Sequence, residues 1–209
     1  MLVFGATGLV GSNVVRQLAN ESDFEEIFVL TRRPLAIDLK SSKVKEFLMD
    51  FDQLDPDSDC FKVDAVICAI GTTIKKAGSK EAFRKVDYSF PLKIAQLSKQ
   101  NGATQFALVS STGANAKSKF FYNRTKGELE RELIALEFKH LVIARPSVLL
   151  GNRTESRPAE RIAQVFGQML PRRWRSIPAS QVAASLIHNL KSDGVGVQLL
   201  ENDQLLQAH

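Results

Sequence analysis

Three spaced glycines near the N-terminus constrain the fold of this chain more than any other feature of its sequence. Gly5, Gly8 and Gly11 belong to the run Gly-Ala-Thr-Gly-Leu-Val-Gly, which follows the apolar residues 2–4 and begins a helical pattern. Such glycines permit a tight turn and the close approach of a pyrophosphate, while the start of the helix presents free N–H groups. The same glycines would also suit a plain strand-to-helix turn. We expect a dinucleotide to bind along Gly5, Ala6, Thr7, Gly8, Leu9, Val10 and Gly11.

Short β-branched runs alternate with longer helical patterns over residues 1–145. This alternation predicts an α/β protein with a Rossmann-type doubly wound parallel sheet, covered by helices on both faces. Helices are expected near Leu9–Ala19, Lys80–Gln100 and Tyr122–Glu137. Strands are expected at Leu2–Phe4, Ile27–Thr31, Val44–Leu48, Ala65–Ala69, Phe106–Ser110, Leu141–Ala144 and Val197–Leu200.

The regularity weakens beyond residue 145. Two further helices are expected near Pro158–Met169 and Ser180–Leu190, and we expect both to belong to a small C-terminal cap. Turn residues separate these pieces, but no stretch has the composition of a linker between independent domains. The sequence therefore predicts one NAD(P)-binding domain over residues 1–209, to which residues 146–209 contribute the substrate-side cap.

Composition and charge exclude several classes of function. No segment approaches the roughly 20 apolar residues of a membrane span, and the N-terminus lacks the pattern of a secretory leader, so we expect a cytoplasmic protein with reduced Cys60 and Cys68. The net charge of +5 suits an anionic small ligand. Nucleic acid is not expected as a partner, because no nucleic-acid-binding motif accompanies the scattered basic residues. The three histidines are also too scattered to predict a metal site.

The residues after the second expected strand indicate which dinucleotide binds. An NAD-binding chain usually carries an acidic residue there, whereas this chain has Arg32 and Arg33. A guanidinium binds a 2′-phosphate that a carboxylate would repel, so we expect NADP(H), with Arg32 on the phosphate and Arg33 on the adenine. An exposed basic turn before Pro34 is the alternative. After the third strand, Asp50 and Phe51 are placed to meet the adenine edge, although Asp50 also suits an ordinary surface position.

A candidate for acid–base chemistry follows the fifth expected strand. Tyr122 and Lys126 are four residues apart and therefore share one face of a helix. A phenol with a pKa of about 10 is a poor proton donor at neutral pH unless a neighbouring cation lowers that pKa. Ser111 is expected to orient a substrate carbonyl, with Ser110 and Thr112 as less favoured choices.

These motifs together resemble a known family. The glycine turn is followed in order by CAIGTT at 68–73, SSTGAN at 110–115, YNRTKGELE at 122–130 and RPSVLLGNRTESRP at 145–158. This order resembles the atypical short-chain dehydrogenase/reductases, and among them the Tat-interacting oxidoreductase family of tumour suppressors and its bacterial relatives. The resemblance implies a Rossmann-type sheet that binds NADPH and a catalytic triad of Ser111, Tyr122 and Lys126. It also implies cofactor contacts from Ala69, Ile70, Gly71, Thr72 and Pro146.

Two hypotheses about function follow. The first is an NADPH-dependent oxidoreductase that reduces a small carbonyl compound. The second is a non-catalytic NADP(H)-sensing protein that regulates a protein partner, because the resembling family includes regulators. Nucleotide sugars are disfavoured as substrates, since the residues after 145 are too few for the larger lobe of the epimerases. A homodimer through the two long helices and solvent exposure of those helices both stay open.

Three other features stay outside these assignments. Lys75 and Lys76 suit either the border of the cofactor cleft or a surface loop. The basic stretch 170–175 is interpreted as a solvated loop with Trp174 packed beneath it, rather than as a contact for an anion or a partner. Asp87, inside the long central helix, is assigned no chemistry.

Overall fold

The computed structural model describes residues 1–39, 41–151, 171–192 and 194–207. Within them a parallel sheet of seven strands forms the centre of the protein, in the order β3-β2-β1-β4-β5-β6-β9. The strands are β1 (Leu2–Phe4), β2 (Ile27–Thr31), β3 (Val44–Leu48), β4 (Ala65–Cys68), β5 (Gln105–Val109), β6 (His140–Arg145) and β9 (Gly196–Glu201). The predicted α/β class and Rossmann-type parallel sheet are confirmed.

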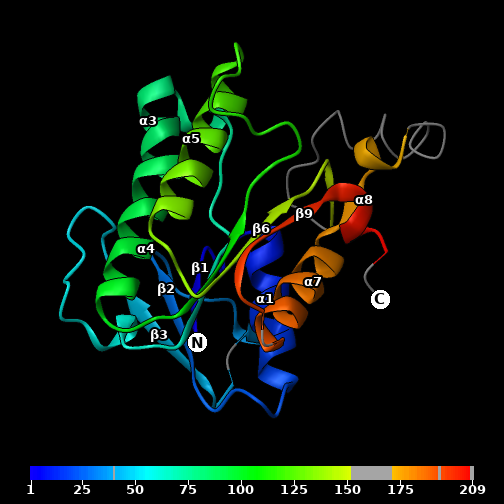
Figure 1. Ribbon diagram of the computed structural model, residues 1–209. Helices are drawn as coiled ribbons and strands as arrows, with labels where there is room; N and C mark the ends of the chain where they lie inside the picture. The colour runs from blue at the N-terminus through cyan, green and yellow to red at the C-terminus, as the bar shows by residue number, and fades with distance from the viewer. Residues whose placement is uncertain (40, 152–170, 193, 208–209) are drawn as a thin grey trace.

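Helices cover both faces of this sheet, as Figure 1 shows. On one face lie α1 (Leu9–Asn20) and α7 (Ala179–Lys191), which contact each other. On the other face lie α4 (Phe90–Gln100) and α5 (Phe121–Ala135). Each face has its own buried apolar cluster, the first centred on residues such as Val14 and Leu186 and the second on residues such as Phe106 and Leu129. The inner strands β1, β2, β4, β5 and β6 are buried almost throughout, as a parallel sheet covered on both faces requires. The edge strands β3 and β9 are only partly buried.

The long helix expected over residues 80–100 is divided into three parts. It starts as α3 (Lys80–Arg84), widens into one π-helical turn over Lys85–Ser89, and continues as α4. A short helix, α2 (Ile74–Ala77), precedes it. A π-turn inside a helix often marks a functional position, because it turns a side chain away from the regular helical face.

The C-terminal part of the chain differs from the expected arrangement. Helix α7 was assigned to a cap, yet it packs against α1 and the sheet because Val182, Ala183, Leu186 and Leu190 form a buried stripe. Strand β9 extends the main sheet beside β6. Outside the sheet, β7 (Leu149–Leu150) pairs with β8 (Ile177–Pro178), and α8 (Asn202–Leu205) follows β9. The helix expected at 158–169 lies outside the described residues, so the cap and the single-domain organisation stay predictions.

The glycine turn brings β1, α1 and β4 into direct contact. A Cβ on Gly11 would lie 2.2 Å from the Gly5 carbonyl oxygen, and a Cβ on Gly5 would lie 2.6 Å from the backbone carbon of Ala69. Gly5 also has a φ of +92°, in the left-handed region that favours glycine. Only glycine at these positions allows the first helix to start so close to the sheet.

Two expected absences concern the whole chain, and the structure addresses its described part only. No helix among the described residues is long and apolar enough to cross a membrane. In the same residues, no group of three or more histidine, cysteine, aspartate or glutamate side chains is arranged to hold a metal. Cys60 and Cys68 are both buried and free.

The close contact at Gly11 generates a test of this packing. Gly11→Ala is expected to lower the free energy of unfolding by about 1–3 kcal/mol or more, because the new methyl group meets backbone that has no room to shift. Urea unfolding measures the change. In Ser12→Ala, the control, only a hydroxyl bonded to the Leu9 carbonyl is lost, and a change within about 0.5 kcal/mol is expected. Equal stability of Gly11→Ala and the control would contradict the packing.

Candidate functional site

A cleft of about 390 Å³ opens where β1 and β4 lie side by side. From β1 the chain proceeds to β2 and β3 on one side, and from β4 it proceeds to β5, β6 and β9 on the other. The loops that leave β1 and β4 therefore diverge, which creates a crevice at the carboxyl ends of the strands. Ten residues expected to bind the cofactor line this cleft: Gly5, Thr7, Gly8, Arg32, Arg33, Phe51, Ala69, Ile70, Gly71 and Thr72.

The glycine turn forms the floor of the cleft. The Gly8 N–H donates to the Gly5 carbonyl at 2.9 Å, which closes the turn. Gly8 is the N-cap of α1, and no described side chain caps that helix. The first amide groups of α1 therefore remain for a ligand, and the positive end of the helix dipole favours an anionic one. Ala6, Leu9, Val10 and Gly11 do not line the cleft and act in the turn through their packing.

Two arginines follow β2 at one side of the cleft. The Thr31 hydroxyl donates to the Arg33 carbonyl at 2.8 Å, which shapes the turn that carries both side chains. The Arg32 guanidinium lies 5.3 Å from the centre of the Phe51 ring, over its face. Within the described part of the chain, neither guanidinium has a carboxylate partner. Both positive charges are thus available to a ligand.

Asp50 lies beside the cleft rather than in it. The Asp50 carboxylate accepts the N–H of Asp52 at 3.0 Å and borders an adjoining hollow next to Arg32 and Pro34. Phe51 instead turns inward, where its ring makes edge contacts with Phe4 and Phe90. Of this pair, the structure places only Phe51 among the cleft-lining residues.

A buried ion pair lies directly behind Gly71 and Thr72, which form one wall of the cleft. The Lys126 ammonium is 2.8 Å from Oδ1 of Asp87, and the two side chains are 4% and 0% exposed. The other oxygen of Asp87 accepts a hydrogen bond from the Thr72 N–H at 2.8 Å. One carboxylate of the π-helical turn therefore binds both the segment that lines the cleft and α5. Burial alone would lower the pKa of Lys126, but the charge of Asp87 and the ionisable Tyr122 raise that pKa above its ordinary value. Lys126 therefore remains protonated at neutral pH.

Sequence reasoning assigned no chemistry to Asp87, and the structure adds that this residue is the buried partner of Lys126. A signal was present in the helical pattern. Asp87 stands between Phe83 and Phe90 in the stripe that continues to Ile94, and all four side chains are buried. A charged residue in a buried stripe needs a partner of opposite charge. The partner, Lys126, lies far away in the sequence, so the pattern alone does not identify it.

Tyr122 and Lys126 share one face of α5. Gly71, which lines the cleft, lies between the cleft and Lys126. A Cβ on Gly71 would lie 3.8 Å from the Lys126 nitrogen and 3.4 Å from Asp87. Tyr122 is half-buried, with its ring centre 5.4 Å from that of Phe83. Ser111, Tyr122, Lys126 and Pro146 do not themselves line the cleft.

The loop after β5 is tied to the start of α5. The Asn115 N–H donates to the Asn123 carbonyl at 3.0 Å, and the Asn123 side-chain amide donates to the Gly113 carbonyl at 2.7 Å. Gly127 lets this loop cross close to the helix, because a Cβ there would lie 2.2 Å from the backbone nitrogen of Ala116. These contacts hold the loop that carries Ser111 against the helix that carries Tyr122.

The three neighbouring hydroxyl groups have different environments. The Ser110 hydroxyl is buried and donates to Glu130, while the Thr112 hydroxyl donates to the Arg145 carbonyl at 2.9 Å. The Ser111 hydroxyl makes only a 3.5 Å contact with the Thr112 carbonyl, at the limit of a hydrogen bond. Ser111 is therefore the hydroxyl that is least engaged by the protein itself.

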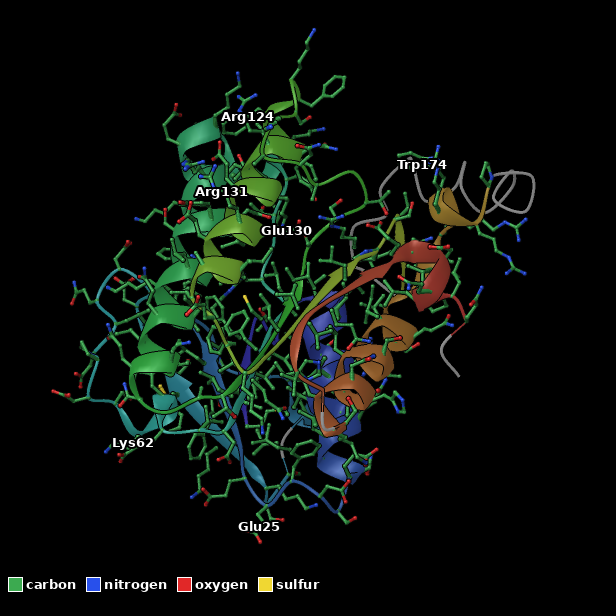
Figure 2. The ribbon with its side chains drawn as sticks, viewed as in Figure 1. Glu25, Lys62, Arg124, Glu130, Arg131 and Trp174 are labelled. Atoms are coloured by element: carbon green, nitrogen blue, oxygen red, sulfur yellow. The ribbon has the colours of Figure 1, made fainter. Side chains whose placement is uncertain are left out.

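A second charge network, which is only partly buried, supports the same end of the sheet. Glu130 lies on the side of α5 that faces the sheet (Figure 2). Its carboxylate accepts a hydrogen bond from Nε of Arg145 at 3.1 Å, and Nη1 of Arg145 donates to Glu201 at 2.7 Å. Hydrogen bonds to Glu130 hold the pKa of Arg145 above its ordinary value, although burial opposes them. This network joins the ends of β5, β6 and β9 to α5, and the sequence pattern did not reveal it.

Six further residues line the cleft that sequence reasoning did not place in the site: Leu30, Thr31, Lys76, Ala77, Ala82 and Val86. For Lys76 the border of the cleft was one of two interpretations, and the structure favours it over a plain surface loop.

Trp174 was expected to pack beneath a loop, and that expectation is wrong. Its side chain is 45% exposed in a short 3-10 turn over Arg172–Trp174 (Figure 2).

Comparison with known sequences identifies relatives along almost the whole chain. A family described as NAD(P)H-binding matches residues 5–193. Protein HTATIP2 of Rattus norvegicus is 36% identical over 212 residues, which cover 99% of this chain and 87% of that protein. A protein of Candida albicans named FMP52, mitochondrial, is 42% identical over 178 residues, which cover 82% of this chain and 77% of the relative.

Comparison with solved structures supports the fold. A structure of MoeE5 in complex with UDP-glucuronic acid and NAD has a TM-score of 0.74 at 18% identity, covering 95% of this chain and 74% of that one. UDP-glucose 4-epimerase of Thermotoga maritima has a TM-score of 0.68 at 14% identity, covering 99% and 80%. At such low identity these similarities establish the arrangement of the chain and not its substrate.

The expected cytoplasmic location is contradicted by the relatives. Fungal proteins that are 32–42% identical to this chain carry the word mitochondrial in their names. The expectation depended on the absence of a membrane span and of a secretory leader pattern, and neither absence distinguishes the cytoplasm from a mitochondrion.

The buried pair generates a prediction about stability. Asp87→Asn is expected to lower the free energy of unfolding at neutral pH by about 3–5 kcal/mol, because the Lys126 charge would stay buried without its partner. The control is Asp52→Asn, which removes a half-exposed partner of Lys85 and should cost no more than about 1 kcal/mol. Urea unfolding of both variants measures the difference, and equal losses would contradict a special role for the buried pair.

The sign of the pH dependence provides a second check on the same variant. The folded-state pKa of Lys126 is raised, so the pair contributes fully below the ordinary lysine pKa of about 10.4. The contribution of the ion pair to stability is lost as pH rises through the folded-state pKa of Lys126. The stability gap between the wild type and Asp87→Asn should therefore shrink above about pH 10.4.

Proposed function

This chain belongs to the NAD(P)H-binding family and has the fold of the short-chain dehydrogenase/reductases, and on that basis we propose that it is an NADP(H)-dependent oxidoreductase that reduces a small carbonyl compound. The observation that carries the proposal is Arg32, which lines the cleft at the end of β2 without a carboxylate partner in the described residues. That position carries an acidic residue in chains that bind the ribose of NAD.

The cleft has the chemistry that a phosphorylated dinucleotide requires. Gly5 and Gly8 leave the backbone uncovered beside the uncapped start of α1, which suits a pyrophosphate. Arg32 presents a planar fork of donors that matches a phosphate, and it is steadied by the Phe51 ring. Among the described residues that line the cleft, none is an aspartate or a glutamate. These features favour NADP(H) over NAD(H).

The reaction itself would depend on Ser111, Tyr122 and Lys126. When bound, NADPH supplies the hydride that reduces the carbonyl carbon. Tyr122 would donate its phenolic proton to the carbonyl oxygen, so that an alcohol forms and a phenolate is left to be reprotonated from solvent. The Lys126 ammonium favours that phenolate, because a nearby positive charge stabilises the ionised form. Asp87 keeps Lys126 protonated and in place.

Ser111 would orient the carbonyl before the transfer. Ser110 and Thr112 already donate to Glu130 and to the Arg145 carbonyl, which leaves Ser111 as the hydroxyl with the weakest internal contact. A donor aimed at the carbonyl oxygen stabilises the charge that develops there. The loop contacts to Asn123 support this role, because they limit the movement of Ser111 relative to Tyr122.

The coenzyme preference can be tested at Arg32. Arg32→Met is expected to weaken NADPH binding about 10- to 100-fold, the loss of charge-assisted hydrogen bonds to one phosphate, and to change NADH binding little. Titration calorimetry with both coenzymes measures the ratio. Arg131→Met, which alters an exposed arginine of α5 paired with Glu132 (Figure 2), is the control. An unchanged NADPH to NADH ratio in Arg32→Met would contradict the assignment.

The acid–base role can be tested at Tyr122. Tyr122→Phe is expected to reduce turnover about 100- to 10,000-fold while the affinity for NADPH stays within about twofold, because only the proton donor is removed. A panel of small carbonyl compounds and quinones, followed by the loss of NADPH absorbance, supplies the substrate. Full activity in Tyr122→Phe would contradict the mechanism. A wild-type protein that binds NADPH but reduces no compound in the panel would point to the regulatory alternative.

A further inference from the structure

Lys76 is a cation of the cleft that the proposed function leaves unused. It lines the same cleft as Arg32 and Arg33 but belongs to α2, in the segment that follows β4. We propose that Lys76 is a third phosphate ligand, which contacts a phosphate group of the bound dinucleotide from the β4 side of the cleft. This inference rests on the proposed function and adds one specific binding residue to it.

Lys76 differs from two nearby lysines, because each of those has a partner within the protein and Lys76 has none among the described residues. Lys85 is paired with Asp52 at 2.7 Å, and the ammonium of Lys80 lies 5.5 Å from the centre of the Phe121 ring. Lys76 is exposed and has neither an acidic nor an aromatic partner among the described residues. A flexible, solvated cation with no internal partner is free to bind an external anion.

The backbone of Lys76 is held in place, although its side chain is exposed. The Lys76 N–H donates to the Thr73 hydroxyl oxygen at 3.1 Å, which caps α2 at its start. The Gly78 N–H donates to the Ile74 carbonyl at 3.0 Å, and Gly78 ends the turn with a φ of +89°. Two residues before the helix, the Thr72 N–H is anchored to the buried carboxylate of Asp87. The segment therefore presents Lys76 to the cleft from a defined turn.

The charges around the cleft fit a ligand with several phosphates. Arg32, Arg33 and Lys76 supply three positive charges, and the lining residues that the structure describes include no carboxylate. A dinucleotide with a 2′-phosphate carries one charge on each of its two bridging phosphates and about 1.5 to 2 more on the terminal one. Arg32 is assigned to the 2′-phosphate, and the start of α1 offers dipoles but no full charge. Lysine binds phosphate as a point charge, which suits a third contact across the cleft.

Lys75 provides a matched control. It is the preceding residue of the same short helix, is exposed, and carries the same charge, but it does not line the cleft. A general effect of net charge on anion binding would act on Lys75 and Lys76 alike. A direct contact would act on Lys76 alone.

The test is titration calorimetry of the full-length wild type, Lys76→Met, Lys76→Arg and Lys75→Met with NADPH and with NADH. Lys76→Met should bind NADPH about 5- to 30-fold more weakly and with a reduced dependence on salt, whereas Lys75→Met should stay within about twofold and Lys76→Arg should recover most of the affinity. A matching loss with NADH would assign Lys76 to the pyrophosphate, and a loss with NADPH alone would assign it to the 2′-phosphate. Either result supports the proposal.

Two results would separate failure of this inference from failure of the proposed function. If the wild type binds NADPH and Lys76→Met binds it equally well, or if Lys75→Met is weakened to the same degree, Lys76 is not a ligand and the proposed function stands. If the folded wild type binds neither coenzyme, the proposed function fails and this inference fails with it. Thermal unfolding of each variant confirms that the comparison is made on folded protein.

Discussion

The close approach of Gly11 to the Gly5 carbonyl fixes how the first strand, the first helix and the cleft are arranged. Without a Cβ at these positions, α1 starts against the end of β1, and the end of β4 packs on the same turn. The loops that follow β1 and β4 then diverge and leave the cleft between them. The same turn directs the positive end of α1 into that cleft, so one steric requirement produces both the shape and the polarity of the site.

The buried ion pair of Asp87 and Lys126 connects this cleft to the residues that would perform chemistry. The Asp87 carboxylate binds the Thr72 amide of the cleft wall with one oxygen and the Lys126 ammonium with the other. The π-helical turn that carries Asp87 interrupts a regular helix at this point. Such a pair costs desolvation free energy on both sides, which makes a purely stabilising role a weak explanation. Under the proposed function, the pair serves to hold a protonated lysine near Tyr122 and behind Thr72 of the cleft.

The sequence predicted the features that local patterns determine. The glycine turn, the parallel strands and the arginines at the end of β2 all lie within short segments whose spacing has a direct physical meaning. Asp87 and Lys126, or Glu130, Arg145 and Glu201, are distant in sequence, and only the folded sheet brings them together. The assignment of α7 to a cap failed for a similar reason, because its apolar stripe does not reveal which surface it covers. The sequence already favoured Ser111 over its neighbours, and the structure adds the partners that occupy the hydroxyls of Ser110 and Thr112.

A crystal structure of the protein with NADP⁺ would show whether the cleft between β1 and β4 holds a phosphorylated dinucleotide. We expect the pyrophosphate against the Gly5–Gly8 turn and the 2′-phosphate within about 3 Å of the Arg32 guanidinium. A nucleotide bound elsewhere on the molecule, or a 2′-phosphate turned away from Arg32 into solvent, would contradict this expectation.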